Sequence, residues 1–339
     1  MVLRTNHEAY FFETSEQGVK CLLCPRECVI KDGDVGFCGI RKAKGKTLYT
    51  LSYGNPCAVN IDPIEKKPFN HFLPGTKAYS IATAGCNLRC LNCQNWTISQ
   101  STPNETSNYK MMPNDVVSNA ITSGCKSIAY TYTEPITFYE YVFDCATIAK
   151  ERGIRNVIKS SGYINPKPLK KWCEVIDAAN IDLKSFDDKT YRKMSKASLQ
   201  PILDTLITLK ENGVWLETTH LLVPSWSDDY KELEKMCKWL SANGFSDTPI
   251  HFSRFFPLYK LEDLPPTPIE TLEQAYEIAV SEGLKYVYTA NTLETDHSDT
   301  YCPKCGERLI QRHGYSVDIN NITNGICGKC GEKIAGIFS

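Results

Sequence analysis

Short apolar runs of β-type composition alternate with longer amphipathic stretches from residue 77 to about residue 291. The runs that predict strands are AYSIAT, SIAYTYT, RNVIKSS, AANIDLK, VWLETTHLLV, PIHFSRF and KYVYTA. The stretches between them predict helices over 114–123, 137–152, 168–177, 201–212, 230–243 and 269–282. This alternation predicts an α/β fold with a parallel sheet and right-handed crossovers. About six such units are too few to close an eightfold barrel, so we expect a partial (β/α)6 barrel.

Polar residues recur at the predicted strand ends, where barrels of this class place their working residues. In chain order they are Cys86, Glu134, Ser160 and Ser161, Asp182 and Lys184, His220, His251 and Arg254, and Asn291. Because the carboxyl ends of parallel strands meet at one edge of the sheet, we expect these side chains to gather there.

Charge and hydropathy exclude some classes of protein. The 339 residues carry a formal net charge of -1, which gives no basic footprint for general nucleic-acid binding. The opening MVLRTNHEAYFF lacks the pattern of a signal peptide, and no apolar run is long enough to cross a bilayer. We therefore expect a cytoplasmic protein without membrane association.

Cysteine is the exceptional residue, with 16 in the chain. Most fall in three tight groups, and CxxC spacing in a cytosolic chain indicates metal rather than disulfides. Five are scattered, and we expect them to be small buried hydrophobes: Cys57, Cys125, Cys145, Cys173 and Cys237.

The central group lies in SIATAGCNLRCLNCQNW and consists of Cys86, Cys90 and Cys93. Thiolates that converge from one loop bind soft metals, commonly as an iron–sulfur cluster. A cubane cluster needs four ligands and this loop offers only three, so one iron would be open to a small molecule. A zinc knuckle and three buried thiols are the alternatives.

The two terminal groups each offer a complete set of four thiolates. Cys21, Cys24, Cys28 and Cys38 lie in CLLCPRECVIKDGDVGFCGIRK and suit either structural zinc or a cluster with no open iron. Near the C-terminus, CPKC and CGKC provide Cys302, Cys305, Cys327 and Cys330. These two knuckles predict a zinc ribbon, with a mononuclear iron site as the alternative.

The spacing of the central group resembles the signature of the radical S-adenosylmethionine (SAM) superfamily. The chain also resembles the AmmeMemoRadiSam group of this superfamily, which is similar to pyruvate formate-lyase activating enzyme. The motifs that carry this resemblance are CLLCPRECVI, DPIEKKPFNHFLPG, AGCNLRCLNCQN, TYTEPITFYEY and YCPKCGERLI. The resemblance implies a 4Fe-4S cluster on Cys86, Cys90 and Cys93, whose open iron chelates SAM. It also implies a reduced flavodoxin- or ferredoxin-type electron donor and association with partners of the Memo and AMMECR1 families.

The resemblance further suggests SAM contacts at the strand ends. Glu134, in TYTEP, stands where the superfamily carries a glycine-rich turn that meets the methionine amine; a carboxylate at a helix N-terminus is the alternative. Asp182 and Lys184 match a segment that contacts SAM in activases, with a surface salt bridge as the alternative. Ser160 and Ser161 are candidates for the ribose or carboxylate, and His251 for the ribose or adenine. His220 and Arg254 are weaker candidates for substrate contact.

These signals predict three regions: an N-terminal metal-binding extension over 1–76, a radical SAM partial barrel over 77–295 and a zinc-ribbon-like domain over 296–339. We expect a radical SAM enzyme that cleaves SAM reductively and abstracts hydrogen from an unidentified substrate, with no catalytic side chain beyond the cluster ligands. A glycyl-radical-enzyme activase is the alternative within this class. A metal-rich binding or electron-transfer module, or a zinc-ribbon nucleic-acid binder, is the alternative outside it.

Overall fold

The computed structural model describes residues 7–292 and 295–339. Its centre is an eight-stranded sheet of order β14-β13-β12-β11-β10-β9-β8-β7. Strands β8 to β14 are parallel and follow chain order, and β7 pairs antiparallel with β8 at one edge. The bounds are β7 (Ala58–Pro63), β8 (Lys77–Ala82), β9 (Ser127–Tyr130), β10 (Arg155–Ser160), β11 (Ala178–Asp182), β12 (Trp215–Leu222), β13 (Ile250–Arg254) and β14 (Val287–Ala290).

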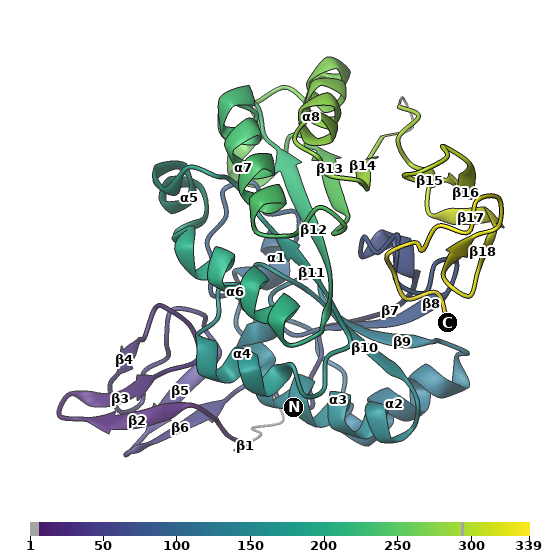
Figure 1. Ribbon diagram of the computed structural model, residues 1–339. Coiled ribbons are helices and arrows are strands. Elements are labelled where there is room, and N and C mark those ends of the chain that lie inside the picture. The colour runs from purple at the N-terminus through teal and green to yellow at the C-terminus, as the bar shows by residue number, and fades with distance from the viewer. Residues whose placement is uncertain (1–6, 293–294) are drawn as a thin grey trace.

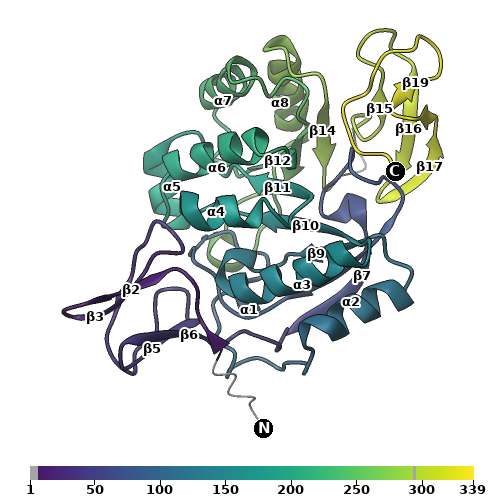
Figure 2. The ribbon, with the colours of Figure 1, turned by 60° about the horizontal axis from the view of Figure 1, so that its bottom comes forward.

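Helices form the crossovers between the parallel strands. They are α1 (Trp96–Ser99), α2 (Pro113–Thr122), α3 (Tyr139–Glu151), α4 (Pro166–Trp172), α5 (Asp188–Ser195), α6 (Gln200–Glu211), α7 (Tyr230–Ala242) and α8 (Ile269–Ser281). Figures 1 and 2 show α2, α3, α4, α6, α7 and α8 following one another around the outside of the sheet. Short 3-10 helices are η1 (Ile64–Lys66), η2 (Pro135–Phe138) and η3 (Tyr259–Leu261).

The middle of the sheet is buried, which explains its sequence pattern. All four residues of β9 are buried, as are the first four of β11. Parallel strands covered on both faces appear as continuous apolar runs rather than as alternating ones. On the helical layer, α3 buries Val142, Cys145, Ala146 and Ala149, which lie three or four residues apart on one face.

The seven predicted strands and six predicted helices are confirmed, with shifted ends. The helix expected over 137–152 begins at Tyr139 because residues 135–138 form the 3-10 turn η2. The helix expected over 168–177 is α4, which ends at Trp172 in a turn at Cys173. Sequence reasoning missed α5, an eight-residue helix with only three buried residues.

Small antiparallel sheets carry the two chain ends. The N-terminal strands are β1 (His7–Glu8), β2 (Phe12–Ser15), β3 (Gly18–Cys21), β4 (Val29–Ile30), β5 (Arg41–Lys44) and β6 (Thr47–Thr50), in the orders β1-β6-β5 and β2-β3-β4. The C-terminal strands are β15 (Thr300–Tyr301), β16 (Arg308–His313), β17 (Ser316–Asn320), β18 (Ile322–Thr323) and β19 (Ile326–Cys327). These two regions lie at opposite ends of the molecule (Figures 1 and 2).

The predicted division into three regions stays a prediction. Residues 1–6 and 293–294, which belong to the first two predicted regions, lie outside the described residues. Strand β7 falls within 1–76 by sequence but joins the central sheet through β8. The C-terminal region packs on Tyr286 and Tyr288, at the last strand of that sheet.

The scattered cysteines are buried or half-buried. Cys125, Cys145 and Cys237 are buried, and Cys57 and Cys173 are half-buried. Within the described ranges, no helix has both the length and the apolar character needed to span a bilayer.

Candidate metal and cofactor site

The central cysteine loop follows β8 and is held in place by other parts of the chain. Gly85 has φ +89°, and a Cβ there would lie 2.7 Å from the carbonyl oxygen of Cys38, so the position requires glycine. The backbone N–H groups of Arg89 and Leu91 donate to the carbonyls of Ser195 and Met194, at 3.0 and 2.9 Å. The end of α5, the helix that sequence reasoning missed, therefore anchors the loop.

Cys86, Cys90 and Cys93 line one large cavity of about 1310 Å³ at the carboxyl ends of the strands. Cys86 is buried, and the other two are half-buried. Burial raises the pKa of the Cys86 and Cys90 thiols, while Lys184 acts in the opposite direction on Cys90. The Cys86 and Cys90 thiols are therefore protonated in the absence of metal, and a metal that binds them must displace protons.

The six residues predicted to contact the cofactor line this same cavity: Glu134, Ser160, Ser161, Asp182, Lys184 and His251. They lie on or after β9, β10, β11 and β13, four of the parallel strands. Asn291, after β14, also lines it and donates from Nδ2 to the carbonyl of Arg254 at 2.9 Å. The structure thus brings the predicted residues together.

Glu134 is almost fully buried and holds the two serines. Its Oε1 accepts from the Ser160 hydroxyl at 2.6 Å, and its Oε2 accepts from the backbone N–H of Ser161 at 2.8 Å. Its Oε1 also accepts from the Ile136 N–H at 3.3 Å, as a cap of η2, which is the alternative geometry considered from sequence. These hydrogen bonds join Glu134, Ser160 and Ser161 into one wall of the cavity. Burial raises the pKa of the Glu134 carboxyl group.

Asp182 lies between two lysines. It accepts from Lys159 Nζ at 2.6 Å and from Lys184 Nζ at 2.8 Å. Burial acts to raise the pKa of Asp182, but the two ammonium groups outweigh it and the pKa lies below its usual range. Lys159 was not expected from sequence; its own pKa is lowered by burial. The trio adds one positive charge to the wall beside Cys90.

His251 is buried and paired with Glu217, a residue that sequence reasoning missed. Its Nε2 lies 2.7 Å from Glu217 Oε2, and Glu217 also accepts from the backbone N–H groups of Asn70 and His71 at 3.0 and 2.9 Å. Burial lowers the pKa of His251 despite this carboxylate. The imidazole is therefore neutral, and Nε2 carries the proton that it donates to Glu217.

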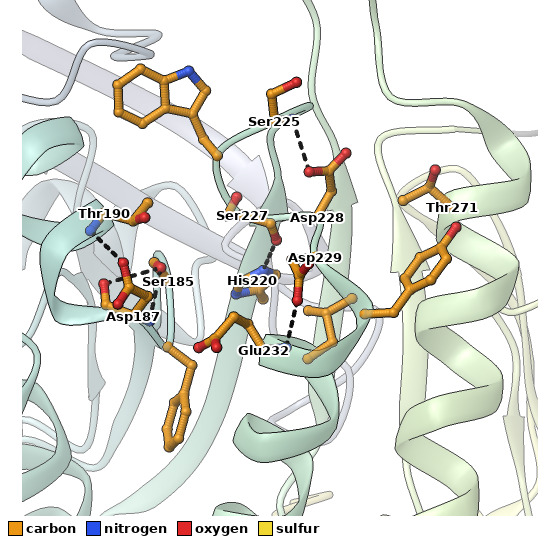
Figure 3. Close-up of a pocket in the computed structure, with 14 residues that line it drawn as sticks. Ser185, Asp187, Thr190, His220, Ser225, Ser227, Asp228, Asp229, Glu232 and Thr271 are labelled. Atoms are coloured by element: carbon orange, nitrogen blue, oxygen red, sulfur yellow. Dashed lines mark hydrogen bonds between the residues drawn. The ribbon is translucent and has the colours of Figure 1, made fainter.

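His220 lies away from the central cavity. Its ring nitrogens face the carbonyls of Leu183 and Ser227 at 2.7 and 2.8 Å, and it lines a separate cavity of about 640 Å³ beside α7 (Figure 3). Arg254 donates from Nε to the carbonyl of Thr267 at 2.9 Å. Neither is among the residues that line the large cavity, so the structure does not bring these two candidates to the central site, and the suggested substrate contacts stay predictions.

The C-terminal strands provide a wall of the large cavity that sequence reasoning did not find. Tyr301, Arg308, Arg312, His313 and Tyr315 line it. Arg312 fixes this wall by donating from Nη2 to the carbonyl of Asn70 at 2.8 Å and from Nη1 to Thr300 Oγ1 at 2.9 Å. No local signal connects residues so far apart in the chain.

The C-terminal cysteines form a compact set. The ligand atoms of Cys302, Cys305, Cys327 and Cys330 all lie within 4.8 Å of one another. Cys302 and Cys330 have sulfurs 3.6 Å apart, and those of Cys305 and Cys327 are 3.8 Å apart. A tetrahedral ion with metal–sulfur bonds of about 2.3 Å separates its sulfurs by about 3.8 Å. The set therefore fits one mononuclear metal ion.

Comparisons with known proteins support the family resemblance predicted from the central cysteine loop. The family model described as the radical SAM superfamily matches residues 80–240. A protein of Methanocaldococcus jannaschii named "Uncharacterized protein MJ0808" is 46% identical over 330 residues, covering 96% of this chain and 98% of that protein. The chain belongs to the radical SAM superfamily.

Other radical SAM relatives are more distant. The pyruvate formate-lyase-activating enzyme of Listeria monocytogenes is 26% identical over 187 residues, which cover 50% of this chain and 71% of that enzyme. The crystal structure of Streptococcus suis SuiB bound to the precursor peptide SuiA has a TM-score of 0.51 and 13% identity, over 68% of this chain and 52% of that one. The first supports an activase-like radical SAM enzyme, and the second supports the fold alone.

Proposed function

We propose that this radical SAM enzyme cleaves SAM reductively at a 4Fe-4S cluster held by Cys86, Cys90 and Cys93, within a partial (β/α)6 barrel. The observation that carries the proposal is one cavity lined by these three thiols and by six polar residues that lie on or after four of the parallel strands. When bound, the reduced cluster supplies one electron to the sulfonium of SAM, which yields methionine and a 5′-deoxyadenosyl radical able to abstract hydrogen.

The lysine–aspartate wall is the proposed partner of the zwitterionic end of SAM. The Lys184 side chain is one-fifth exposed, lines the cavity and is already paired with Asp182. The Lys184 ammonium group can donate a further hydrogen bond to the SAM carboxylate. The Asp182 carboxylate can accept a hydrogen bond from the SAM amine. The Glu134, Ser160 and Ser161 wall would position the neighbouring backbone, and His251, fixed by Glu217, would meet the ribose or adenine.

The size of the cavity supports a second ligand beside SAM. Small-molecule sites commonly occupy about 300–1000 Å³, and this cavity exceeds that range at about 1310 Å³. Arg308, His313 and Tyr315 belong to its C-terminal wall. We propose that the substrate binds against this C-terminal wall; the substrate itself stays unidentified, and activation of a glycyl radical enzyme is the second candidate, supported by the activase relatives.

The partners are proposals of the same kind. A reduced flavodoxin- or ferredoxin-type protein would supply the electron, and proteins of the Memo and AMMECR1 families are candidates by sequence resemblance. Co-purification of tagged protein with each candidate, grown without oxygen, tests this association.

Anaerobically reconstituted protein, given SAM and dithionite, is expected to make 5′-deoxyadenosine and methionine. Cys90→Ala is expected to abolish both products, whereas Cys173→Ala, a half-buried cysteine outside the three groups, is expected to retain them. Fully loaded wild-type protein that binds SAM but yields no 5′-deoxyadenosine, even with a flavodoxin donor and candidate substrates, would overturn the proposal.

A further inference from the structure

The N-terminal cysteines surround a cavity of their own. Cys21 ends β3, Cys24 and Cys28 lie in the following turn, and Cys38 precedes β5. All four line this cavity, together with Arg41 and Asn87 among others. The turn is closed by a hydrogen bond from the Cys21 N–H to the Cys28 carbonyl at 2.9 Å. The four thiols therefore converge on one space from a single N-terminal segment.

The spacing of these thiols is too wide for one zinc ion. In the described ranges, the C-terminal set is the only group of three or more Cys, His, Asp or Glu whose ligand atoms all lie within 4.8 Å. Four thiolates on one zinc ion touch one another, whereas in a cubane cluster each thiolate binds a different iron, so the thiolates lie farther apart.

A buried cation faces the same cavity. Arg41 is 1% exposed, and its Nη1 donates to Glu140 Oε1 at 2.7 Å. Its Nε and Nη2 have no hydrogen-bond partner within the protein. Buried donors without partners are costly, and the sulfides of an iron–sulfur cluster accept such hydrogen bonds. Arg41 therefore supplies the donors that a polynuclear cluster can use.

This cavity adjoins the central cysteine loop. Asn87, which lines the N-terminal cavity, follows Cys86 directly in the chain. Gly85, on the other side of Cys86, packs so closely on the Cys38 carbonyl that a Cβ would lie 2.7 Å from it. The N-terminal site is thus joined to a ligand of the central site by direct backbone contact.

We propose that Cys21, Cys24, Cys28 and Cys38 hold a second, four-iron cluster, and that this cluster relays single electrons from the external donor to the central cluster. Each relay step moves one electron from the reduced flavodoxin- or ferredoxin-type donor to the N-terminal cluster and then to the central one, and no bond is made or broken. The relay rests on the function proposed above, whereas the cluster assignment does not.

The cluster is tested by iron and acid-labile sulfide in the triple variant Cys86→Ala, Cys90→Ala, Cys93→Ala of the full chain. About half of the wild-type iron and sulfide should remain, because each four-iron site holds about four of each. Cys173→Ala serves as the control and should keep the wild-type content. Loss of nearly all sulfide, with zinc bound in its place, overturns the cluster.

The relay is tested in the double variant Cys24→Ala, Cys28→Ala. The rate of 5′-deoxyadenosine formation with reduced flavodoxin should fall by more than about ten-fold, and the rate with dithionite, a small reductant, by less than about three-fold. Equal losses with both reductants would indicate a structural role and overturn the relay. A wild-type protein with about eight irons that never makes 5′-deoxyadenosine would instead overturn the proposed function and leave the cluster intact.

Discussion

The N-terminal and C-terminal sets of four cysteines differ in how the chain builds them. At the C-terminus, two knuckles repeat the same geometry: the N–H of Gly306 donates to the Cys302 carbonyl, and that of Gly331 to the Cys327 carbonyl, both at 2.9 Å. The sulfurs come as close as 3.6 Å. The N-terminal cysteines come from one segment, and their sulfurs are more widely spaced than those of the C-terminal set. The buried Arg41 lines the same cavity.

The comparison leads us to expect that two sets of four cysteines hold different metals. A short repeat of CxxC turns brings four sulfurs into contact around one ion. Ligands that are not arranged as two repeated turns can leave room for a cluster and for a charged side chain beside it. Position differs as well, because the N-terminal set touches the central loop and the C-terminal strands form a wall of the large cavity.

The largest effect is expected from removing the C-terminal metal. The double variant Cys302→Ser, Cys305→Ser should unfold the C-terminal strands, because structural zinc contributes about 10–16 kcal/mol to folding of such small units. Metal analysis should show the loss of one ion, and limited proteolysis should cleave after residue 295. Iron at the other two sites should persist; loss of all iron would show that the sites are not independent.

Arg41→Met tests the buried cation that sets the N-terminal site apart. It leaves the buried Glu140 carboxylate without its ion-pair partner, so the free energy of unfolding should fall by about 3–5 kcal/mol. The reduction potential of the N-terminal cluster should also fall, because a nearby positive charge stabilises the reduced state. Both are measured, by denaturant titration and by potentiometry monitored with electron paramagnetic resonance.

Arg155→Met is the matched control for that experiment. Arg155 forms an ion pair with Asp177 at 2.9 Å but is 48% exposed, so its loss should cost only about 0–1 kcal/mol. It should leave the potential unchanged. An Arg41 variant that matches this control in stability and potential would remove Arg41 from the N-terminal site.

Gly85→Ala against Gly306→Ala tests the contact between the N-terminal and central sites. A methyl group at Gly85 meets the Cys38 carbonyl at 2.7 Å and the Ile40 side chain at 2.5 Å, whereas one at Gly306 meets nothing within 4 Å. We expect a cost of about 2–4 kcal/mol at Gly85 and about 1–2 kcal/mol at Gly306, by denaturant titration. Equal costs would contradict the close contact.

Lys184→Ala tests whether the cofactor wall is separate from both terminal sites. A lost charge-assisted hydrogen bond is worth about 1.5–3 kcal/mol, so SAM binding measured by calorimetry should weaken roughly ten- to a hundred-fold. Metal content at all three sites should not change. Lys170→Ala, on the exposed side of α4, is the control, and unchanged SAM affinity in the Lys184 variant would remove Lys184 from the wall.

The sequence by itself determined the α/β architecture, the cysteine sets and the polar residues of the large cavity. Strands and helices follow from local apolar periodicity. The gathering of Glu134, Asp182 and His251 follows because parallel strands present their carboxyl ends at one edge. Both signals are local or topological, so they can be recognised in a single chain.

Only the tertiary structure decided which partner each polar residue meets. Glu217 lies opposite His251, and Arg312 reaches Asn70, across 34 and 242 residues of chain. The short helix α5 anchors the central cysteine loop, and only the tertiary contact between the two reveals this role. The N-terminal and C-terminal cysteines likewise differ in their sulfur spacing and surroundings, which depend on how distant segments pack and leave no periodic trace in the sequence.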